Sequence, residues 1–252
     1  MAEPLLRVEG LVKRFGALAA TDGASFEVQP GELHALIGPN GAGKTTLIHQ
    51  ISGALRPDAG RIEFAGQDLS HTGMAARVRA GLVRSYQITS VFKRLSTLDN
   101  LCLAMQARRH GVAFWRAAAS DGAARDEAMA LLGRVGLAAR AEQAAGSLAH
   151  GEQRQLELGL ALAARPRLLL LDEPLAGMGS EESARMVELL QALRHETTLL
   201  LVEHDMDAVF RLADRITTLV AGRVIASDTP DAIRAHPEVL KAYLGDELEA
   251  LP

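Results

Sequence analysis

One stretch of the chain combines glycines, a lysine and two hydroxyl side chains in an order suited to holding a chain of phosphates. It spans residues 38–46 and matches the pattern G-x-x-x-x-G-K-[ST]. Glycines at such a turn allow successive backbone N–H groups to face one anion, the lysine can reach the β- and γ-phosphates, and the next hydroxyl can coordinate Mg²⁺. The stretch therefore predicts a binding site for a nucleoside triphosphate. The residues expected to form it are Gly38, Pro39, Asn40, Gly41, Ala42, Gly43, Lys44, Thr45 and Thr46.

The segments on either side of this loop have the periodicity that the motif requires. Before it, the apolar run Leu33–Ile37 predicts a buried strand. After it, apolar residues recur at helical spacing over residues 47–51, and Gly53 stands where such a helix would end. A glycine-rich turn that carries a lysine by chance would not require a strand before it and a helix after it.

Two neighbouring acids follow a second apolar run. The leucines at residues 168–171 predict a buried parallel strand, and Asp172 and Glu173 come directly after it. Ligands and catalytic groups collect at the carboxyl ends of parallel strands. We therefore expect Asp172 to hold Mg²⁺ together with Thr45, and Glu173 to polarise a water molecule for attack on the γ-phosphate. The alternative, two solvated acids at a strand end, is disfavoured by the phosphate-binding motif upstream.

Composition excludes several classes of protein. The chain has 252 residues and a net charge of −4, so it lacks the basic footprint typical of nucleic-acid binding. Cys102 is its single cysteine, which excludes an internal disulfide and is typical of a reducing compartment. We expect no signal peptide, and no apolar run approaches the ~20 residues of a membrane span. If the protein works at a membrane, other chains must supply the membrane-spanning part.

The order of the expected elements indicates an α/β fold with a mostly parallel sheet. Helical periodicity dominates about residues 72–165, which we interpret as a helical insertion, and short helices form a C-terminal extension over about residues 229–252. A further helix is expected to start at Ser180, with that residue as its cap. The expected strands are at residues 5–8, 25–28, 33–37, 61–64, 168–171, 197–202 and 216–220.

A third motif, at residues 148–153, resembles the signature of ATP-binding-cassette (ABC) ATPases, and the resemblance extends from about residue 5 to residue 244. It implies that Gln87 contacts the metal and relays closure of the site, that His204 contacts the γ-phosphate, and that Phe15 stacks on adenine. Glu173, His204 and Gln87 are thus the expected catalytic residues, and Thr45, Gln87 and Asp172 the expected metal site. The signature residues expected to contact nucleotide are Leu148, Ala149, His150, Gly151, Glu152 and Gln153.

The same resemblance implies the architecture and the assembly. The chain should be one domain over residues 1–252, with a P-loop NTPase core around a mostly parallel sheet, an antiparallel β subdomain and an inserted helical subdomain. Two cassettes should form a head-to-tail dimer in which the signature of one faces the phosphate-binding loop of the other. ATP binding then closes the dimer, and hydrolysis reopens it.

Two residues depart from the family pattern on surfaces offered to the opposite cassette. Ala149 replaces the serine whose hydroxyl contacts the γ-phosphate, and Gly179 stands where the family carries an aspartate. Loss of one charge-assisted hydrogen bond typically costs ~1.5–3 kcal/mol. We therefore expect this chain to catalyse normally at its own phosphate-binding loop and to support the half-site of its partner less well.

Residues 148–157, 203–206 and 237–245 resemble the ATPase subunits of branched-chain amino-acid importers. The resemblance implies ATP and Mg²⁺ as cofactors, and as partners a second ABC ATPase, two transmembrane permease subunits and, indirectly, a periplasmic binding protein. Ala149 and Gly179 favour a different chain as the second ATPase, although a homodimer is an alternative. The expected location is the cytoplasmic face of the inner membrane, as a peripheral subunit.

Other functions share the catalytic residues. Urea and short-chain amide importers belong to the same branch, and the ATPase of a lipid or polysaccharide exporter would carry every one of these motifs. A soluble ABC ATPase of repair or translation usually has tandem cassettes or a coiled-coil insertion, and the sequence shows neither. Residues 88–101 are expected to help form the groove that receives a helix of the membrane subunit.

Overall fold

The computed structural model describes residues 3–85, 91–110 and 122–249. Its centre is a six-stranded sheet with the strand order β10-β9-β3-β8-β7-β6. All neighbouring pairs are parallel except β9 with β10. The strands are β3 (Leu33–Ile37), β6 (Leu82–Arg84), β7 (Leu168–Asp172), β8 (Thr198–Val202), β9 (Arg215–Val220) and β10 (Arg223–Asp228).

The three central strands β3, β7 and β8 are buried along their whole length because both faces of the sheet are covered. Side chains alternate between the faces, so Leu168 and Leu170 enter one hydrophobic cluster while Leu169 and Leu171 enter another. This explains why the sequence of β7 is a continuous run of leucines. The sheet therefore presents rigid carboxyl ends for the residues that follow.

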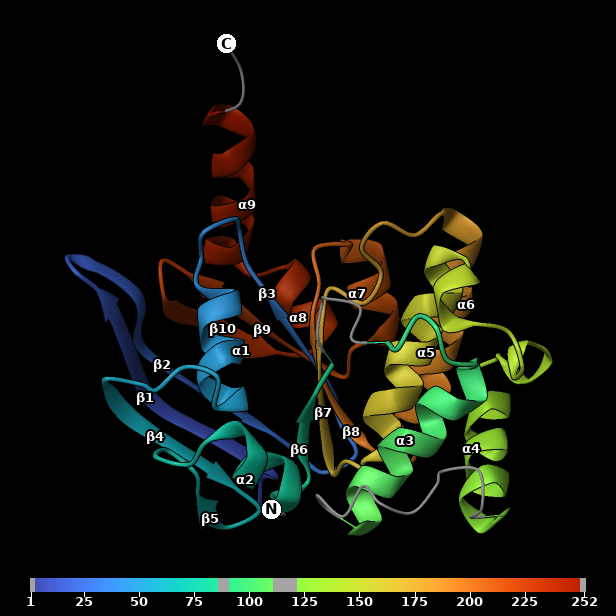
Figure 1. Ribbon diagram of the computed structural model, residues 1–252. Coiled ribbons are helices and arrows are strands. Elements are labelled where there is room, and N and C mark those ends of the chain that lie inside the picture. Colours follow the sequence, from blue (N-terminus) through green and yellow to red (C-terminus); the bar gives the residue numbers. More distant parts are fainter. Residues whose placement is uncertain (1–2, 86–90, 111–121, 250–252) are drawn as a thin grey trace.

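A second, antiparallel sheet covers one face, with the order β2-β1-β4-β5. Helix α1 (Lys44–Ser52) packs between the two sheets through its apolar side. Figure 1 shows this sheet on one side of the molecule and helices α3, α4 and α5 on the other. The strands of the antiparallel sheet are β1 (Leu6–Phe15), β2 (Leu18–Val28), β4 (Ala59–Phe64) and β5 (Gln67–Asp68).

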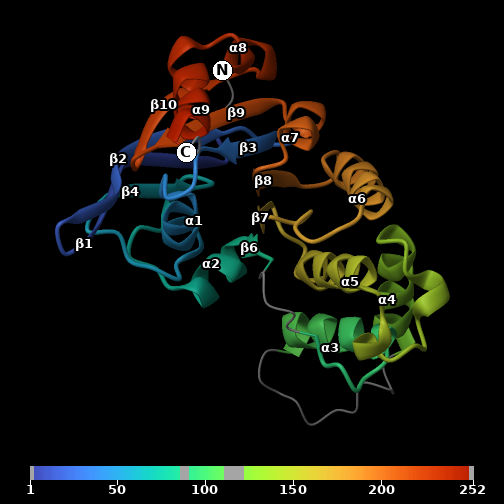
Figure 2. The same cartoon turned by 90° about the horizontal axis from the view of Figure 1, so that it is seen from above.

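The opposite face of the main sheet is covered by helices. Seen from above, α3, α4 and α5 form a group beside α6 (Figure 2). The C-terminal helix α9 extends away from the body (Figure 1), and no described helix is long and apolar enough to cross a membrane. The helices are α2 (Met74–Ala80), α3 (Thr97–His110), α4 (Gly122–Arg134), α5 (His150–Ala163), α6 (Ser180–Leu193), α7 (Met206–Leu212), α8 (Pro230–Arg234) and α9 (Pro237–Glu249).

The structure differs from the sequence-based expectation at three places. The segment expected as a helical insertion over residues 72–165 contains β6, which pairs with β7 in the parallel sheet, and the grouped helices begin only at Thr97. The first two strands, β1 and β2, are much longer than predicted. Register shifts in their pairing interrupt the alternating pattern, so the sequence pattern did not indicate their full length. The cap of α6 is Gly179, and Ser180 is already the first helical residue.

Candidate active site

The loop that joins β3 to α1 has a backbone that only glycine can supply at two positions. Gly38 has φ 151° and Gly43 has φ 102°. A Cβ at Gly38 would lie 2.0 Å from the carbonyl oxygen of Leu219, and one at Gly43 would lie 2.1 Å from that of Ala20. Backbone carbonyl groups of β2 and β9 therefore lie directly against the loop, and they leave no room for a side chain at either glycine.

Helix α1 starts at Lys44, and no side chain caps its N-terminus among the described residues. The backbone N–H groups of its first turn are therefore available to an anion. Thr45, the second residue of the helix, is exposed. This is the arrangement expected at a phosphate-binding site.

Lys44 lies folded over the loop. Its Nζ donates to the carbonyl oxygens of Gly38 at 2.6 Å and Pro39 at 2.9 Å. Burial lowers the pKa of Lys44, and the nearby carboxylates of Glu173 and Asp172 oppose that effect. The ammonium group, the loop and both acids therefore lie within electrostatic reach of one another.

Asp172 ends β7 and is held by a cation on the neighbouring strand. Arg84 of β6 donates from Nη2 to Asp172 Oδ2 at 2.7 Å, and the two side chains are only 7% and 5% exposed. A buried carboxylate requires such a partner to remain charged. His49 of α1 is close to both, since its pKa is lowered by burial and by Arg84 and raised by Asp172. The contact with Arg84 fixes the carboxylate at the edge of the sheet beside α1.

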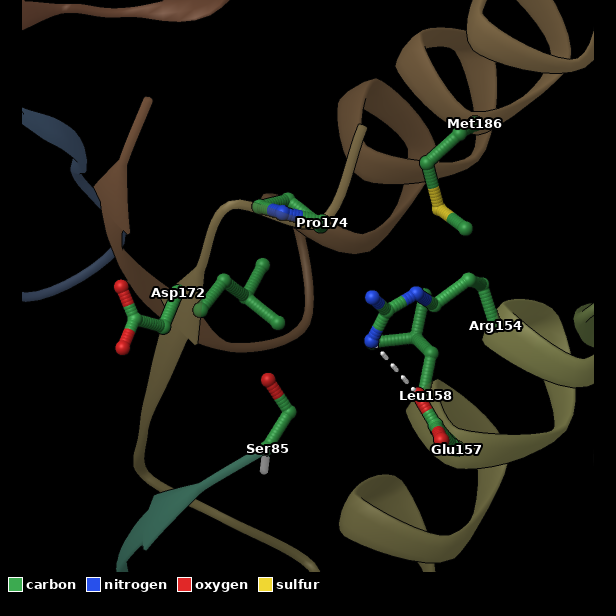
Figure 3. Close-up of a pocket in the computed structure, with 8 residues that line it drawn as sticks. Ser85, Arg154, Glu157, Leu158, Asp172, Pro174 and Met186 are labelled. Carbon is green, nitrogen blue, oxygen red and sulfur yellow. Dashed lines mark hydrogen bonds and ion pairs between the residues drawn. The ribbon is translucent and has the colours of Figure 1, made fainter. Parts of the chain in front are cut away.

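A small cavity separates this edge from α5, and its lining includes Ser85, Arg154, Glu157 and Asp172. Figure 3 shows the carboxylate of Asp172 pointing away from the other polar groups of the cavity. Arg154 pairs instead with Glu157 at 3.1 Å, one turn along the same helix. The cavity is therefore not where Asp172 would meet a ligand.

Glu173 and His204 face each other across the ends of two adjacent strands. Asp172 pairs with Val202 in the β7–β8 ladder, so the residues that follow are neighbours. Glu173 Oε1 lies 4.0 Å from His204 Nδ1, and the side chains are 34% and 67% exposed. Glu173 has φ 49°, a left-handed conformation that costs a non-glycine residue ~1–3 kcal/mol. This turn sends Glu173 in a different direction from Asp172.

The signature residues lie at the start of α5, whose N-cap is Ala149. Glu152 Oε2 accepts from the backbone N–H of Ala149 at 3.0 Å, which is one half of a capping box. Alanine has no side-chain oxygen to supply the other half. Arg140 Nε donates to Glu152 Oε1 at 2.8 Å, and Gln153 Nε2 donates to the carbonyl of Leu148 at 3.0 Å. Glu152 and Gln153 therefore shape the turn rather than extend from it.

The structure brings only part of the expected site together within one chain. Lys44, Asp172, Glu173 and His204 converge at the carboxyl edge of the sheet, whereas the start of α5 lies apart from α1 in both views (Figures 1 and 2). Phe15 sits at the turn between β1 and β2, 51% exposed. Gln87 lies outside the described residues.

Sequence reasoning missed two residues at this edge, Arg84 and Glu203. Each is a charged residue at the end of a buried strand. That position was the only feature of the sequence that could have indicated a role at the site. A charge at such a position is normally assigned to the surface. Here both side chains are buried.

Comparison with known proteins decides the family. The sequence profile of the family described as ABC transporter matches residues 21–176, more than half of the chain. The chain belongs to the ABC transporter family. A second profile, branched-chain amino acid ATP-binding cassette transporter, matches residues 223–249 of this cassette.

Curated relatives cover the cassette from end to end. The high-affinity branched-chain amino acid transport ATP-binding protein LivG of Escherichia coli (strain K12) is 39% identical over 256 residues, covering 98% of this chain and 100% of the relative. The corresponding protein BraF of Pseudomonas aeruginosa is 38% identical over 257 residues, with the same coverage.

Solved structures give the same fold. The ADP conformation of an ATP-binding cassette of an ABC transporter superposes with a TM-score of 0.86 at 29% identity, covering 97% of this chain and 100% of that one. A nucleotide-free cassette gives a TM-score of 0.84 at 28% identity, covering 96% and 99%. The predicted fold, a P-loop core with a mostly parallel sheet, an antiparallel sheet and helices, is confirmed. The cassette is an ATPase.

Proposed function

We propose that this cassette hydrolyses ATP to power a membrane importer of branched-chain amino acids. The observation that carries the proposal is end-to-end similarity to LivG and BraF, including the C-terminal segment from β10 to α9 that has its own family profile. The phosphate-binding loop and the acids occur in every transport alternative considered above. The C-terminal segment is what favours this branch over an exporter ATPase.

The residues at the edge of the sheet support a division of labour in hydrolysis. The N–H groups of the loop and of α1 bind the β- and γ-phosphates, and Lys44 exchanges its two carbonyl partners for phosphate oxygens. Glu173 orients and polarises the attacking water. His204, on the adjacent strand end, donates to the γ-phosphate. The exposed ring of Phe15 offers a stacking surface for adenine.

The oxygen donors at this edge fit a magnesium ion. Thr45 offers a hydroxyl and Asp172 a carboxylate, and Mg²⁺ favours such oxygen ligands while keeping several waters and taking phosphate oxygens. Bound there, the ion would neutralise charge that develops on the β- and γ-phosphates. Arg84 would keep Asp172 oriented for that role. Gln87 belongs to the same proposed set.

The separation of α5 from the loop supports a two-chain site. We infer that residues 148–153 present the N-terminus of α5 to the nucleotide of a second cassette, with a different chain as the favoured partner. The further partners are two transmembrane permease subunits and, through them, a periplasmic binding protein. The cassette would then be a peripheral subunit at the cytoplasmic face of the inner membrane.

The test is purification of the tagged chain from its native cells in mild detergent, followed by reconstitution of the recovered complex into proteoliposomes. We expect two permease subunits and a second cassette, and ATP-dependent uptake of labelled leucine once the binding protein is added. Uptake of urea or a short amide, with none of leucine, would overturn the substrate. Recovery of no membrane protein would overturn the transport function.

A further inference from the structure

Glu203 is a buried carboxylate that the mechanism above does not use. It follows β8 directly and precedes His204, and its side chain is 0% exposed. Burial raises its pKa, and hydrogen bonds from backbone N–H groups oppose that rise. A charged group so deeply buried must be satisfied by its surroundings.

Three backbone N–H groups from two loops converge on this carboxylate. The N–H of Leu175 donates to Oε1 at 2.9 Å, and that of His204 donates to Oε2 at 3.1 Å. The N–H of Asp205 is a third donor. Leu175 belongs to the loop of residues 173–179 after β7, whereas His204 and Asp205 form the turn between β8 and α7. One side chain thus joins the segment that carries Glu173 to the segment that carries His204.

A backbone hydrogen bond also joins the ends of strands β7 and β8. The N–H of Glu173 donates to the carbonyl of Val202 at 2.9 Å, and this backbone bond holds the two strand ends in register without Glu203. The Glu203 carboxylate adds a contact beyond the ends of the strands, because it holds the loop of residues 173–179 at Leu175. Hydrogen bonds to an ionised acceptor are roughly twice as strong as neutral ones.

We propose that Glu203 is a positioning residue that locks the loop of residues 173–179 to the His204 turn, so that Glu173 and His204 are placed as one unit. The same lock would make any displacement of that loop, which ends at Gly179 on the surface offered to a second cassette, move His204 with it. This inference rests on the proposed hydrolytic roles of Glu173 and His204.

The test is Glu203→Gln in the full-length chain, assembled in its complex. Glutamine has the same shape, but its amide nitrogen donates and cannot accept from backbone N–H groups. We expect kcat for ATP hydrolysis at the half-site of this chain to fall about tenfold or more while its KM for ATP changes less than about twofold, because the phosphate-binding loop is untouched.

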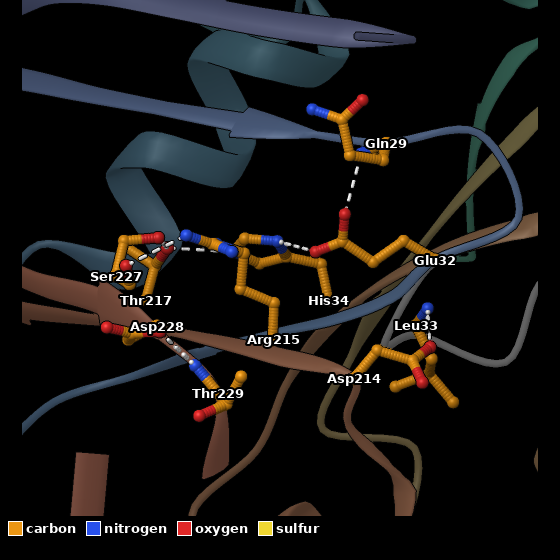
Figure 4. A network of polar contacts seen from close by, with 10 residues as sticks. All are labelled: Gln29, Glu32, Leu33, His34, Asp214, Arg215, Thr217, Ser227, Asp228 and Thr229. Atoms are coloured by element: carbon orange, nitrogen blue, oxygen red, sulfur yellow. Dashed lines mark hydrogen bonds and ion pairs between the residues drawn. The ribbon is translucent and has the colours of Figure 1, made fainter. Parts of the chain in front are cut away.

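Glu32→Gln is the matched control. Glu32 is another buried glutamate of the same sheet, but it precedes β3 and so lies at the edge opposite the site. Figure 4 shows it between the backbone N–H of Gln29 and the ring of His34, at 2.7 Å from each. We expect this variant to lower the melting temperature and to leave kcat unchanged.

Amide hydrogen exchange gives a readout separate from activity. In Glu203→Gln, exchange should rise at Leu175 and Asp205 and stay unchanged in α1. A kcat equal to wild type, or equal losses of kcat in both glutamine variants, would overturn the positioning role. If the wild-type complex hydrolyses no ATP, or Glu173→Gln hydrolyses it normally, the proposed function itself fails and Glu203 is not the cause.

Discussion

The two parts of the proposed catalytic site differ in how their residues are held. At the carboxyl edge of the sheet the functional groups are held by buried partners, as Arg84 holds Asp172 and Glu203 holds the loops of Glu173 and His204. At the start of α5 and α6 the N-caps are Ala149 and Gly179, neither of which has a side-chain acceptor. Under the proposed function, the carboxyl edge would serve the nucleotide of this chain, and the starts of α5 and α6 would serve the nucleotide of a second cassette. We therefore expect an ATPase pair with unequal half-sites.

The largest expected effect comes from Glu173→Gln, which tests the edge of the sheet directly. Removing a positioned general base typically costs ~10²–10⁴-fold in rate. Hydrolysis by the half-site of this chain should be lost while ATP binding persists, measured by phosphate release and by equilibrium binding of a fluorescent ATP analogue. Glu181→Gln, an exposed acid in the first turn of α6, is the control and should change neither. Loss of binding in Glu173→Gln would contradict the assigned role.

Arg84→Gln should reduce both stability and metal dependence. Breaking a buried ion pair by removing one partner typically destabilises a protein by ~3–5 kcal/mol, because the other charge stays buried. We expect a lower melting temperature and a weaker effect of Mg²⁺ on nucleotide affinity, since Asp172 loses its orientation. Arg7→Gln removes a partly exposed ion pair with Glu27 and should change neither quantity. An unchanged Mg²⁺ dependence in Arg84→Gln would show that Asp172 is positioned without Arg84.

The difference between local motifs and side chains held by distant partners explains what the sequence could predict. The loop of residues 38–46 and the leucines of β7 are local patterns, so a motif and a periodicity were enough to locate Lys44, Asp172 and the parallel core. Arg84 and Glu203 depend on partners far away in the chain, 88 residues for Asp172 and 28 for Leu175. A charged residue beside an apolar run gives no sign of such a partner. The signature residues and Phe15 were assigned through resemblance, and their roles stay predictions.

Ala149→Ser tests the N-terminus of α5. Serine would complete the capping box with Glu152, which is worth ~0.5–2 kcal/mol of stability, and would offer a hydroxyl to the nucleotide of the partner, worth ~1.5–3 kcal/mol. To isolate the second effect, the change is made together with Glu173→Gln, so that only the half-site of the partner turns over. The remaining ATPase rate should then rise.

Ala164→Ser, at the opposite end of α5, is the control for Ala149→Ser, because a hydroxyl there cannot cap the N-terminus of the helix. It should raise neither the melting temperature nor the rate. If Ala149→Ser raises the melting temperature but leaves the rate of the partner unchanged, the missing hydroxyl is a matter of helix stability alone. Inequality of the half-sites would then have to come from Gly179.

Gly179→Asp should have the smallest effect on the isolated cassette. Gly179 has φ −71° and ψ 167°, which any residue can adopt, and a Cβ there would meet nothing within 4 Å. Replacing glycine by aspartate at an N-cap gains only about a few tenths of a kcal/mol. Its larger consequence should appear in the assembled complex, where a carboxylate would reach the surface of the second cassette. Gly179→Asn supplies the same cap without the charge, so a rise in ATPase rate with aspartate alone would assign the effect to contact across the dimer. Equal rates in the two variants would leave the missing family aspartate without a catalytic role in this chain.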